Sequence, residues 1–184
     1  MALNKETGQA QCWGDLRFGG DCRGISFLSV TDVASTAFVF LALTKKTGQA
    51  LCWGYMENNG DCSASYFVGA MIHDISDIYS TYDAFMALSK ETGQAQCWGH
   101  SGNGGSCSGL DLAGVTDVYS NDFAFVALNK ETGEAQCWGP SSFGGSGSAF
   151  MALNKETGQA QCWGDWGNGG SCGGLDFAFL SSSG

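Results

Sequence analysis

The chain has 184 residues, with 8 basic and 18 acidic side chains and a formal net charge of −10. Nucleic-acid backbones and anionic membranes are bound through clustered Lys and Arg, so this balance argues against both as partners. Glycine is frequent (29 residues), proline occurs once and aromatic residues make up 12%, a composition that can bury a core. The longest apolar run, Ala37–Leu43, is far shorter than the roughly 20 residues that a membrane-spanning helix needs.

The strongest feature of the sequence is an internal repeat. The segment ALNKETGQAQCWGD occurs unchanged at Ala2–Asp15 and Ala152–Asp165, and three near-identical copies start at Ala42, Ala87 and Ala127. The starts are separated by 40, 45, 40 and 25 residues, and the last interval is short because a segment matching VTDVYS is absent before Ala149. The spacing predicts a single repeat domain of five units, at about 1–24, 25–69, 70–109, 110–148 and 149–184.

Each full unit predicts the same elements in the same order. A short strand with a central Asp comes first, and the apolar run Phe123–Leu128 then has the length and composition of a strand covered on both faces. Lys-Glu-Thr-Gly forms a turn in which Gly133 takes a positive φ, and Gln-Ala-Gln-Cys-Trp is a return strand with a period of two. The equivalent first strands are Val30–Ser35, Ile75–Ser80 and Val115–Ser120. No segment has apolar residues at helical spacing, so the sequence predicts an all-β protein made of tandem short antiparallel sheets.

The cysteines follow the repeat. Four pairs are each separated by 10 positions and bracket the same loop, and they are Cys12 and Cys22, Cys52 and Cys62, Cys97 and Cys107, and Cys162 and Cys172. In the remaining copy Cys137 has Gly147 at the partner position, which explains the odd count of 9 and predicts a buried, inert thiol. Zinc is the alternative, but the chain has no CxxC pair, so four local disulfides are favoured over a metal site. Disulfides in turn indicate a secreted, cell-surface or organelle-lumen location. Met1 opens directly onto a repeat strand, so the sequence as given carries no signal peptide, which indicates either a mature or trimmed form or a start that is not the biological one.

The repeat resembles that of the regulator of chromosome condensation family. The residues that carry the resemblance are Val115, Val118, Ala127, Leu128, Gly133, Trp138 and Gly139. Members of that family fold as β-propellers with four-stranded blades, so the resemblance implies blade-like units in a closed or incomplete propeller. This chain resembles a cysteine-bearing variant of the repeat that contains the motifs CWG and VTDVYS. A closed or nearly closed arrangement is favoured, because Phe177–Leu180 aligns with the strand that precedes the first hairpin and would cover its edge. The family's Gly-Gln-Leu-Gly after Trp-Gly is absent, and nucleotide exchange and chromatin binding are not carried over.

The sequence gives little support for catalysis or for a cofactor. The plausible neutral-pH bases are His73 and His100, and near-identical units do not build the non-repeated constellation that an enzyme needs. The Gly-rich loops lack the Lys-Ser/Thr and the helix of a phosphate site. Calcium is a weak alternative in the loops that hold Asp15 with Asp21, Glu57 with Asn58 and Asp61, and Asp165 with Asn168, because carboxylates recur irregularly there.

Tryptophan offers a last candidate site. One Trp recurs in every copy, which favours packing between blades, although exposed rings beside Asp and Asn would suit a sugar. Trp166 is extra, and with Asp165 and Asn168 it is the best candidate for a ligand-binding loop. We therefore expect a non-catalytic module for protein–protein contact, or a peripheral subunit of a larger assembly, in an oxidising compartment. The alternative is a multivalent carbohydrate-binding protein.

Overall fold

The computed structural model describes residues 1–55, 72–139, 149–153 and 160–164. In these residues the fold consists of five small antiparallel sheets and two short 3-10 helices, with no α-helix. No helix in these segments has the length and apolarity to cross a bilayer. The predicted fold class, tandem short antiparallel sheets in a propeller-like arrangement, is confirmed.

Three of the sheets have three strands and two have two. The first sheet pairs β1 (Ala2–Asn4) with β2 (Gln9–Gln11), and the fifth pairs β12 (Ala149–Leu153) with β13 (Ala160–Gly164). The second, third and fourth sheets have the apolar strand in the middle. Their strands, in chain order, are β3 (Asp32–Ser35), β4 (Val39–Thr44) and β5 (Gln49–Gly54); β6 (Asp77–Ser80), β7 (Ala84–Ser89) and β8 (Gln94–Gly99); and β9 (Asp117–Ser120), β10 (Phe125–Leu128) and β11 (Ala135–Trp138).

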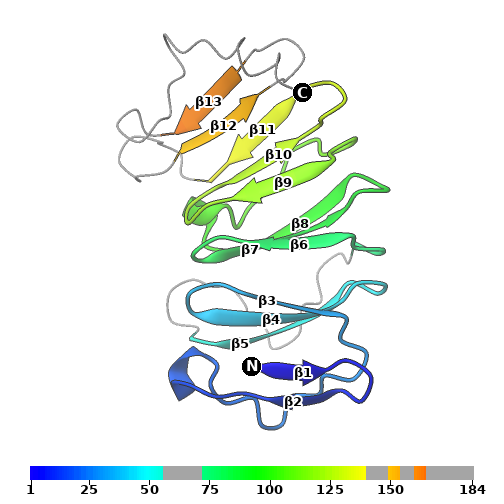
Figure 1. Ribbon diagram of the computed structural model, residues 1–184, viewed down its shortest axis with the longest axis vertical. Coiled ribbons are helices and arrows are strands. Elements are labelled where there is room, and N and C mark those ends of the chain that lie inside the picture. The colour runs from blue at the N-terminus through cyan, green and yellow to red at the C-terminus, as the bar shows by residue number, and fades with distance from the viewer. Residues whose placement is uncertain (56–71, 140–148, 154–159, 165–184) are drawn as a thin grey trace, which may run out of the picture.

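The sheets stack face to face, with the first and the fifth at opposite ends of the stack (Figure 1). The described sheets therefore form an open stack, unlike the closed or nearly closed arrangement that the sequence favours. Successive sheets turn only gradually, so five of them do not bring the two ends together. The strand proposed to seal the ring, Phe177–Leu180, lies outside the described residues.

The middle strands are buried on both faces, because each face meets a different neighbour. On β4, Leu41 and Leu43 are fully buried against the third sheet, whereas Ala42 packs with residues of the first sheet. On β7, Ala87 faces the second sheet and Met86 the fourth. Full burial of a Leu or Met side chain contributes roughly 1.5–3 kcal/mol, and a strand that meets a neighbour on each face is continuously apolar rather than alternating.

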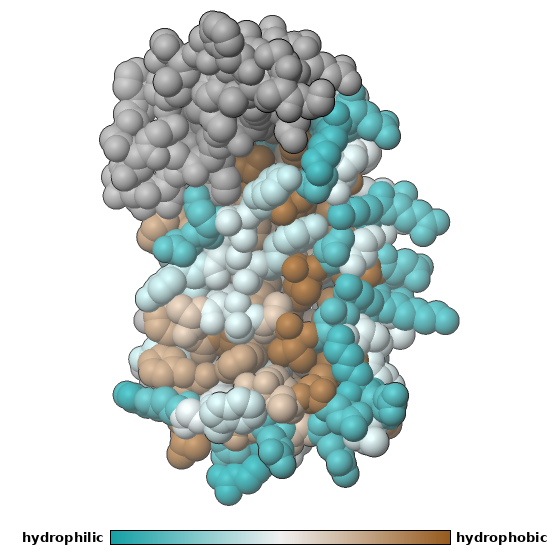
Figure 2. Space-filling view, viewed as in Figure 1, coloured by the Kyte–Doolittle hydropathy of each residue, from teal (hydrophilic) through white to brown (hydrophobic). Residues whose placement is uncertain are grey.

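The hairpin turns close as predicted. Gly133 has φ 75°, and its N–H donates to the carbonyl of Asn129 at 2.8 Å. In the second, third and fourth sheets the Asp of the first strand forms an ion pair with the turn Lys of the same unit: Lys45 Nζ lies 3.5 Å from Asp32, Lys90 Nζ 2.9 Å from Asp77, and Lys130 Nζ 2.9 Å from Asp117. Figure 2 shows hydrophilic side chains along this side of the stack and apolar ones over its middle and opposite side.

Candidate functional site

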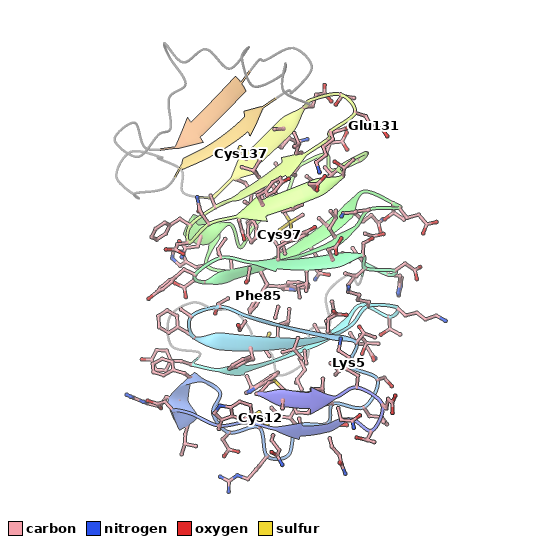
Figure 3. The ribbon with its side chains drawn as sticks, viewed as in Figure 1. Lys5, Cys12, Phe85, Cys97, Glu131 and Cys137 are labelled. Atoms are coloured by element: carbon pink, nitrogen blue, oxygen red, sulfur yellow. A yellow bond between two sulfur atoms is a disulfide. The ribbon has the colours of Figure 1, made fainter. Side chains whose placement is uncertain are left out.

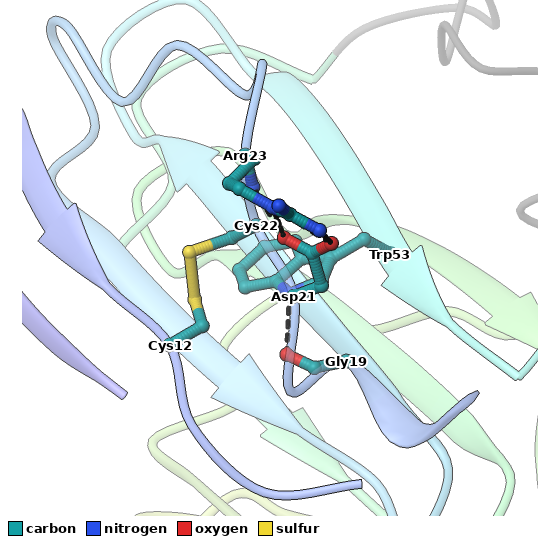
Figure 4. Close-up of a disulfide and its surroundings, with 6 residues drawn as sticks. All are labelled: Cys12, Gly19, Asp21, Cys22, Arg23 and Trp53. Carbon is teal, nitrogen blue, oxygen red and sulfur yellow. Dashed lines mark hydrogen bonds and ion pairs between the residues drawn. A yellow bond between two sulfur atoms is a disulfide. The ribbon is translucent and has the colours of Figure 1, made fainter. Parts of the chain in front are cut away.

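The repeated tryptophan joins neighbouring sheets. The indole N–H of Trp53 donates to the carbonyl of Gly19 at 3.2 Å (Figure 4), and that of Trp138 donates to Gly104 at 3.2 Å. Each donor and acceptor are 34 positions apart, so the bond links one unit to the loop of the unit before it. The Trp53 ring also stacks on Phe40, its cross-strand partner, with centroids 5.3 Å apart.

These tryptophans therefore have a structural role, in agreement with the interpretation that the repeated Trp packs between neighbouring units. Trp53, Trp98 and Trp138 are only 6–8% exposed, which leaves no ring face free to stack on a sugar. Trp13 differs: it is 66% exposed, because in the described structure no unit lies on the outer side of the first sheet.

Two of the four predicted disulfides are bonded in the described residues. Cys12 joins Cys22 with an S–S distance of 2.04 Å (Figures 3 and 4), and Cys97 joins Cys107. Cys52 is also disulfide-bonded, and its predicted partner, Cys62, lies outside the described residues. The side chains of Cys162 and Cys172 are outside them as well.

Cys137 is a free thiol on β11. Burial raises its pKa to about 12, so almost no thiolate is present at neutral pH. Because the thiolate is the nucleophile and the metal ligand, this pKa agrees with the inert thiol that the sequence predicts, but the side chain is partly rather than fully buried.

The carboxylates proposed as calcium ligands in the first loop are already paired. Arg23 donates to both oxygens of Asp21, at 2.6–3.1 Å, and this bonding holds the pKa of Asp21 at about 2. Arg17 does the same to Asp15 and lowers its pKa. Each guanidinium neutralises the charge that a cation would need. In the described part of the chain no three His, Cys, Asp or Glu side chains gather as metal ligands.

A different set of positions forms the candidate site: those that vary between otherwise near-identical units. They lie at the end of each sheet opposite the Lys-Glu-Thr-Gly turns, and we call them the rim. Backbone bonds join the rim from sheet to sheet: the N–H of Ala37 donates to Tyr82 at 3.2 Å, and the N–H of Tyr82 donates to Asp122 at 2.9 Å. In Figure 3, ring side chains project on this side, away from the labelled Lys5 and Glu131. The rim residues are Phe18, Ala37, Phe38, Tyr55, Tyr82, Asp83, His100, Asn103, Asp122 and Phe123.

The first half of the rim is aromatic. Phe18 lies 5.8 Å from Phe38 and 5.5 Å from Tyr55, and Phe38 lies 5.1 Å from Tyr82, measured between ring centroids. The four rings, which we call the aromatic cluster, come from three consecutive sheets and their loops. Tyr82 is 43% exposed and the others are partly exposed, while the guanidinium of Arg17 lies 5.4 Å from the Phe18 centroid.

The local sequence explains how these rings reach one surface. Phe18 ends the 3-10 helix η1 (Leu16–Phe18), which the Asp15 side chain caps. The hydroxyl of Thr36 accepts from the N–H groups of Phe38 and Val39, which fixes the turn that carries Phe38. Tyr55 continues β5 and donates its N–H to the carbonyl of Phe38 at 2.9 Å.

The second half of the rim is polar. Asn103, at the end of the 3-10 helix η2 (Ser101–Asn103), donates its side-chain N–H to Asp83 at 3.4 Å, and its carbonyl accepts the Thr81 hydroxyl at 2.8 Å. Burial raises the pKa of Asp83, and the neighbouring His100 partly opposes this. The Nδ1 of His100 is buried without a hydrogen-bond partner among the described residues.

The structure describes only some of the residues that the sequence singles out. Of the two candidate bases, His100 lies on the rim, while His73 is exposed in the connection before β6. The proposed ligand residues Trp166, Asp165 and Asn168 lie outside the described residues. Sequence reasoning missed the aromatic cluster, although the differences between aligned units, such as Tyr55 where another unit has His100, could have indicated it.

The sequence matches no family model and no curated protein. Solved structures similar to the chain include the ectodomain of the receptor kinase CR4 from Physcomitrella patens (18% identity, TM-score 0.47) and the CRINKLY WD40 ectodomain of ACR4 from Arabidopsis thaliana (13%, 0.40). A third is Prp20p from Saccharomyces cerevisiae (21%, 0.40), described with its binding to Gsp1p and histones. The matches cover 74%, 60% and 64% of this chain, which spans 39%, 36% and 32% of theirs. At these TM-scores the similarities do not assign the chain to a family.

Proposed function

We propose that this chain is a non-catalytic protein-interaction module that binds a protein partner through the aromatic cluster. The observation that carries the proposal is the gathering of one exposed and three partly exposed rings from three units on one rim, at positions where the units differ. The residues that the units share instead build the scaffold: the buried Trp, the turn Gly and the paired Lys and Asp. A surface built jointly by successive repeats is the kind of surface that repeat proteins use for binding.

The chemistry of the cluster fits a protein better than a sugar. Tyr, Phe and Arg are enriched in protein interfaces, where aromatic anchors dominate the binding energy. The rings are tilted against one another by 40° to 86°, so they form one continuous apolar surface rather than parallel platforms for sugar rings. The bonded disulfides support an oxidising compartment. Within this proposal, a module of this small size would act as a peripheral subunit docked on a larger assembly.

Two exposed tyrosines give a matched test. Tyr82 is 43% exposed within the cluster, and Tyr119 is 49% exposed on β9 of the fourth sheet, which contributes no ring to the cluster. Wild-type, Tyr82→Ala and Tyr119→Ala proteins are used as bait in quantitative affinity capture from a secreted or lumenal extract. We expect a specific protein whose capture falls about tenfold or more with Tyr82→Ala and changes less than about twofold with Tyr119→Ala.

Equal capture by the two variants would overturn the proposal. A glycan array, with Trp166→Ala as its control, tests the alternative: sugar binding lost in that variant, together with no Tyr82-dependent protein, would replace the interaction module with the carbohydrate-binding protein.

A further inference from the structure

The outer face of the first sheet carries residues that every described internal unit buries. Ala2 is exposed, whereas the alanines at the same register position are at most 1% exposed: Ala42, Ala87 and Ala127. Trp13 is 66% exposed, whereas its counterparts are 6–8% exposed.

The internal junctions show what such a face accepts. Ala42 and Trp53 pack with Leu3 and Ala10 of the preceding sheet, and the indole N–H of Trp53 binds a carbonyl in the preceding unit's Gly-Gly loop. The junction between the third and fourth sheets repeats the same contacts with Ala127. The face thus has the chemistry of a junction: a small side chain that permits close approach, and an indole donor for a loop carbonyl.

The fifth sheet carries the matching sequence. Its strand β12 reads AFMAL, as does Ala84–Leu88 of β7, and the registers of the two hairpins are the same. On β7, Met86 and Leu88 pack against the following sheet. The fifth sheet of the same molecule lies at the far end of the stack from β1, so it does not reach the exposed face (Figure 1).

We infer that the first sheet of one copy binds the fifth sheet of a second copy, head to tail, and continues the stack across the junction. Such an interface joins two different surfaces, so it repeats along a growing chain unless the rotation closes a ring. Each added copy presents another rim, and the aromatic clusters then act as a multivalent array. The inference does not depend on which partner the cluster binds.

The test uses Ala2→Arg, which places a long charged side chain on the exposed face and leaves the internal packing untouched. Ala113→Arg is the matched control, because Ala113 is also exposed and lies in the loop before β9. Sedimentation velocity over a range of concentrations should show the wild-type average mass rising to more than twice the 19.2 kDa of the chain. The average mass of Ala113→Arg should rise with concentration as that of the wild type does. Ala2→Arg should remain a monomer with an unchanged far-UV circular dichroism spectrum.

Mixing separates head-to-tail assembly from a symmetric dimer. Ala2→Arg keeps its fifth sheet, so adding it in excess should cap wild-type chains and reduce their average mass to near that of a dimer. A wild-type protein that stays monomeric at every concentration would overturn the inference. Association of Ala2→Arg like that of wild type, or a wild-type mass that Ala2→Arg cannot reduce, would do the same. Tyr82→Ala should assemble normally, which keeps this result independent of partner binding.

Discussion

Substitutions in the Gly-Gly loop, whose Gly104 carbonyl accepts the indole N–H of Trp138, test directly whether the sheets stack as described. Gly104 has φ 90°, and a Cβ added there would lie 2.5 Å from Cδ2 and 2.8 Å from Cε2 of Phe125. Phe125 is fully buried and stacks on Trp138 with centroids 5.4 Å apart, so its ring has no room to move aside. Gly104→Ala therefore combines backbone strain with overpacking.

Gly109 separates these two effects. It has φ 83°, and a Cβ there would meet nothing within 4 Å. The left-handed backbone costs an alanine about 1 kcal/mol at either position, and overpacking a core adds typically about 1–3 kcal/mol. We expect Gly104→Ala to lower the free energy of unfolding by about 2–4 kcal/mol and Gly109→Ala by about 1 kcal/mol.

A second pair in the first unit repeats the comparison. Gly19 has φ 84° and its added Cβ would lie 2.6 Å from Phe40, whereas Gly24 has φ 82° and open space. The assay is urea-induced unfolding followed by far-UV circular dichroism for the four variants and wild type. If Gly104→Ala and Gly109→Ala lose equal stability, and Gly19→Ala and Gly24→Ala do too, the loops do not pack on the next sheet and the stacking described above is wrong.

Further predictions concern single side chains. Trp138→Phe removes the hydrogen bond to the buried Gly104 carbonyl and should lower the free energy of unfolding in urea by about 1–3 kcal/mol. Trp13→Phe, at a 66% exposed site, should change it by less than about 0.5 kcal/mol. Equal losses in the two variants would contradict the assigned roles. With a pKa of about 12 against an ordinary value of 9.0, Cys137 should hold about 1000-fold less thiolate at neutral pH than a free cysteine. Its reaction with a disulfide reagent should therefore be slow when folded and fast in urea, and rapid labelling of the native protein would refute the burial. Because Arg23 lowers the pKa of Asp21 to about 2, Asp21 stays charged as the pH falls towards that value. Arg23→Gln should return that pKa towards 3.8 in a carboxyl NMR titration, and an unchanged value would show that the ion pair is absent in solution.

The sequence was a good guide wherever the information is local. The period of the repeat, the turn glycine at Gly133 and the apolar run Phe123–Leu128 predict a hairpin, and the structure has one with that turn. The fixed spacing of Cys12 and Cys22 identifies a loop whose ends meet, because a hairpin's return strand and the loop after it remain close together. These features depend on contacts between residues near one another along the chain.

Other features depend on how whole units meet. The sequence alone leaves two roles open for the repeated tryptophan, and only the stack shows Trp53 donating to a loop carbonyl 34 positions away. It also draws attention to Trp166 as the exposed ring, while the described surface is aromatic at Phe18, Phe38 and Tyr82, residues that come from different sheets.

The amino-acid sequence by itself determined the unit: strand lengths, turns, and which cysteines share a loop, because each is set by neighbours a few residues apart. Tertiary structure alone decided which face of the first sheet lacks a neighbour and which side chains from separate units share the rim. Those outcomes follow from the small rotation between successive sheets, which no single unit encodes because it arises from the packing of one sheet on the next.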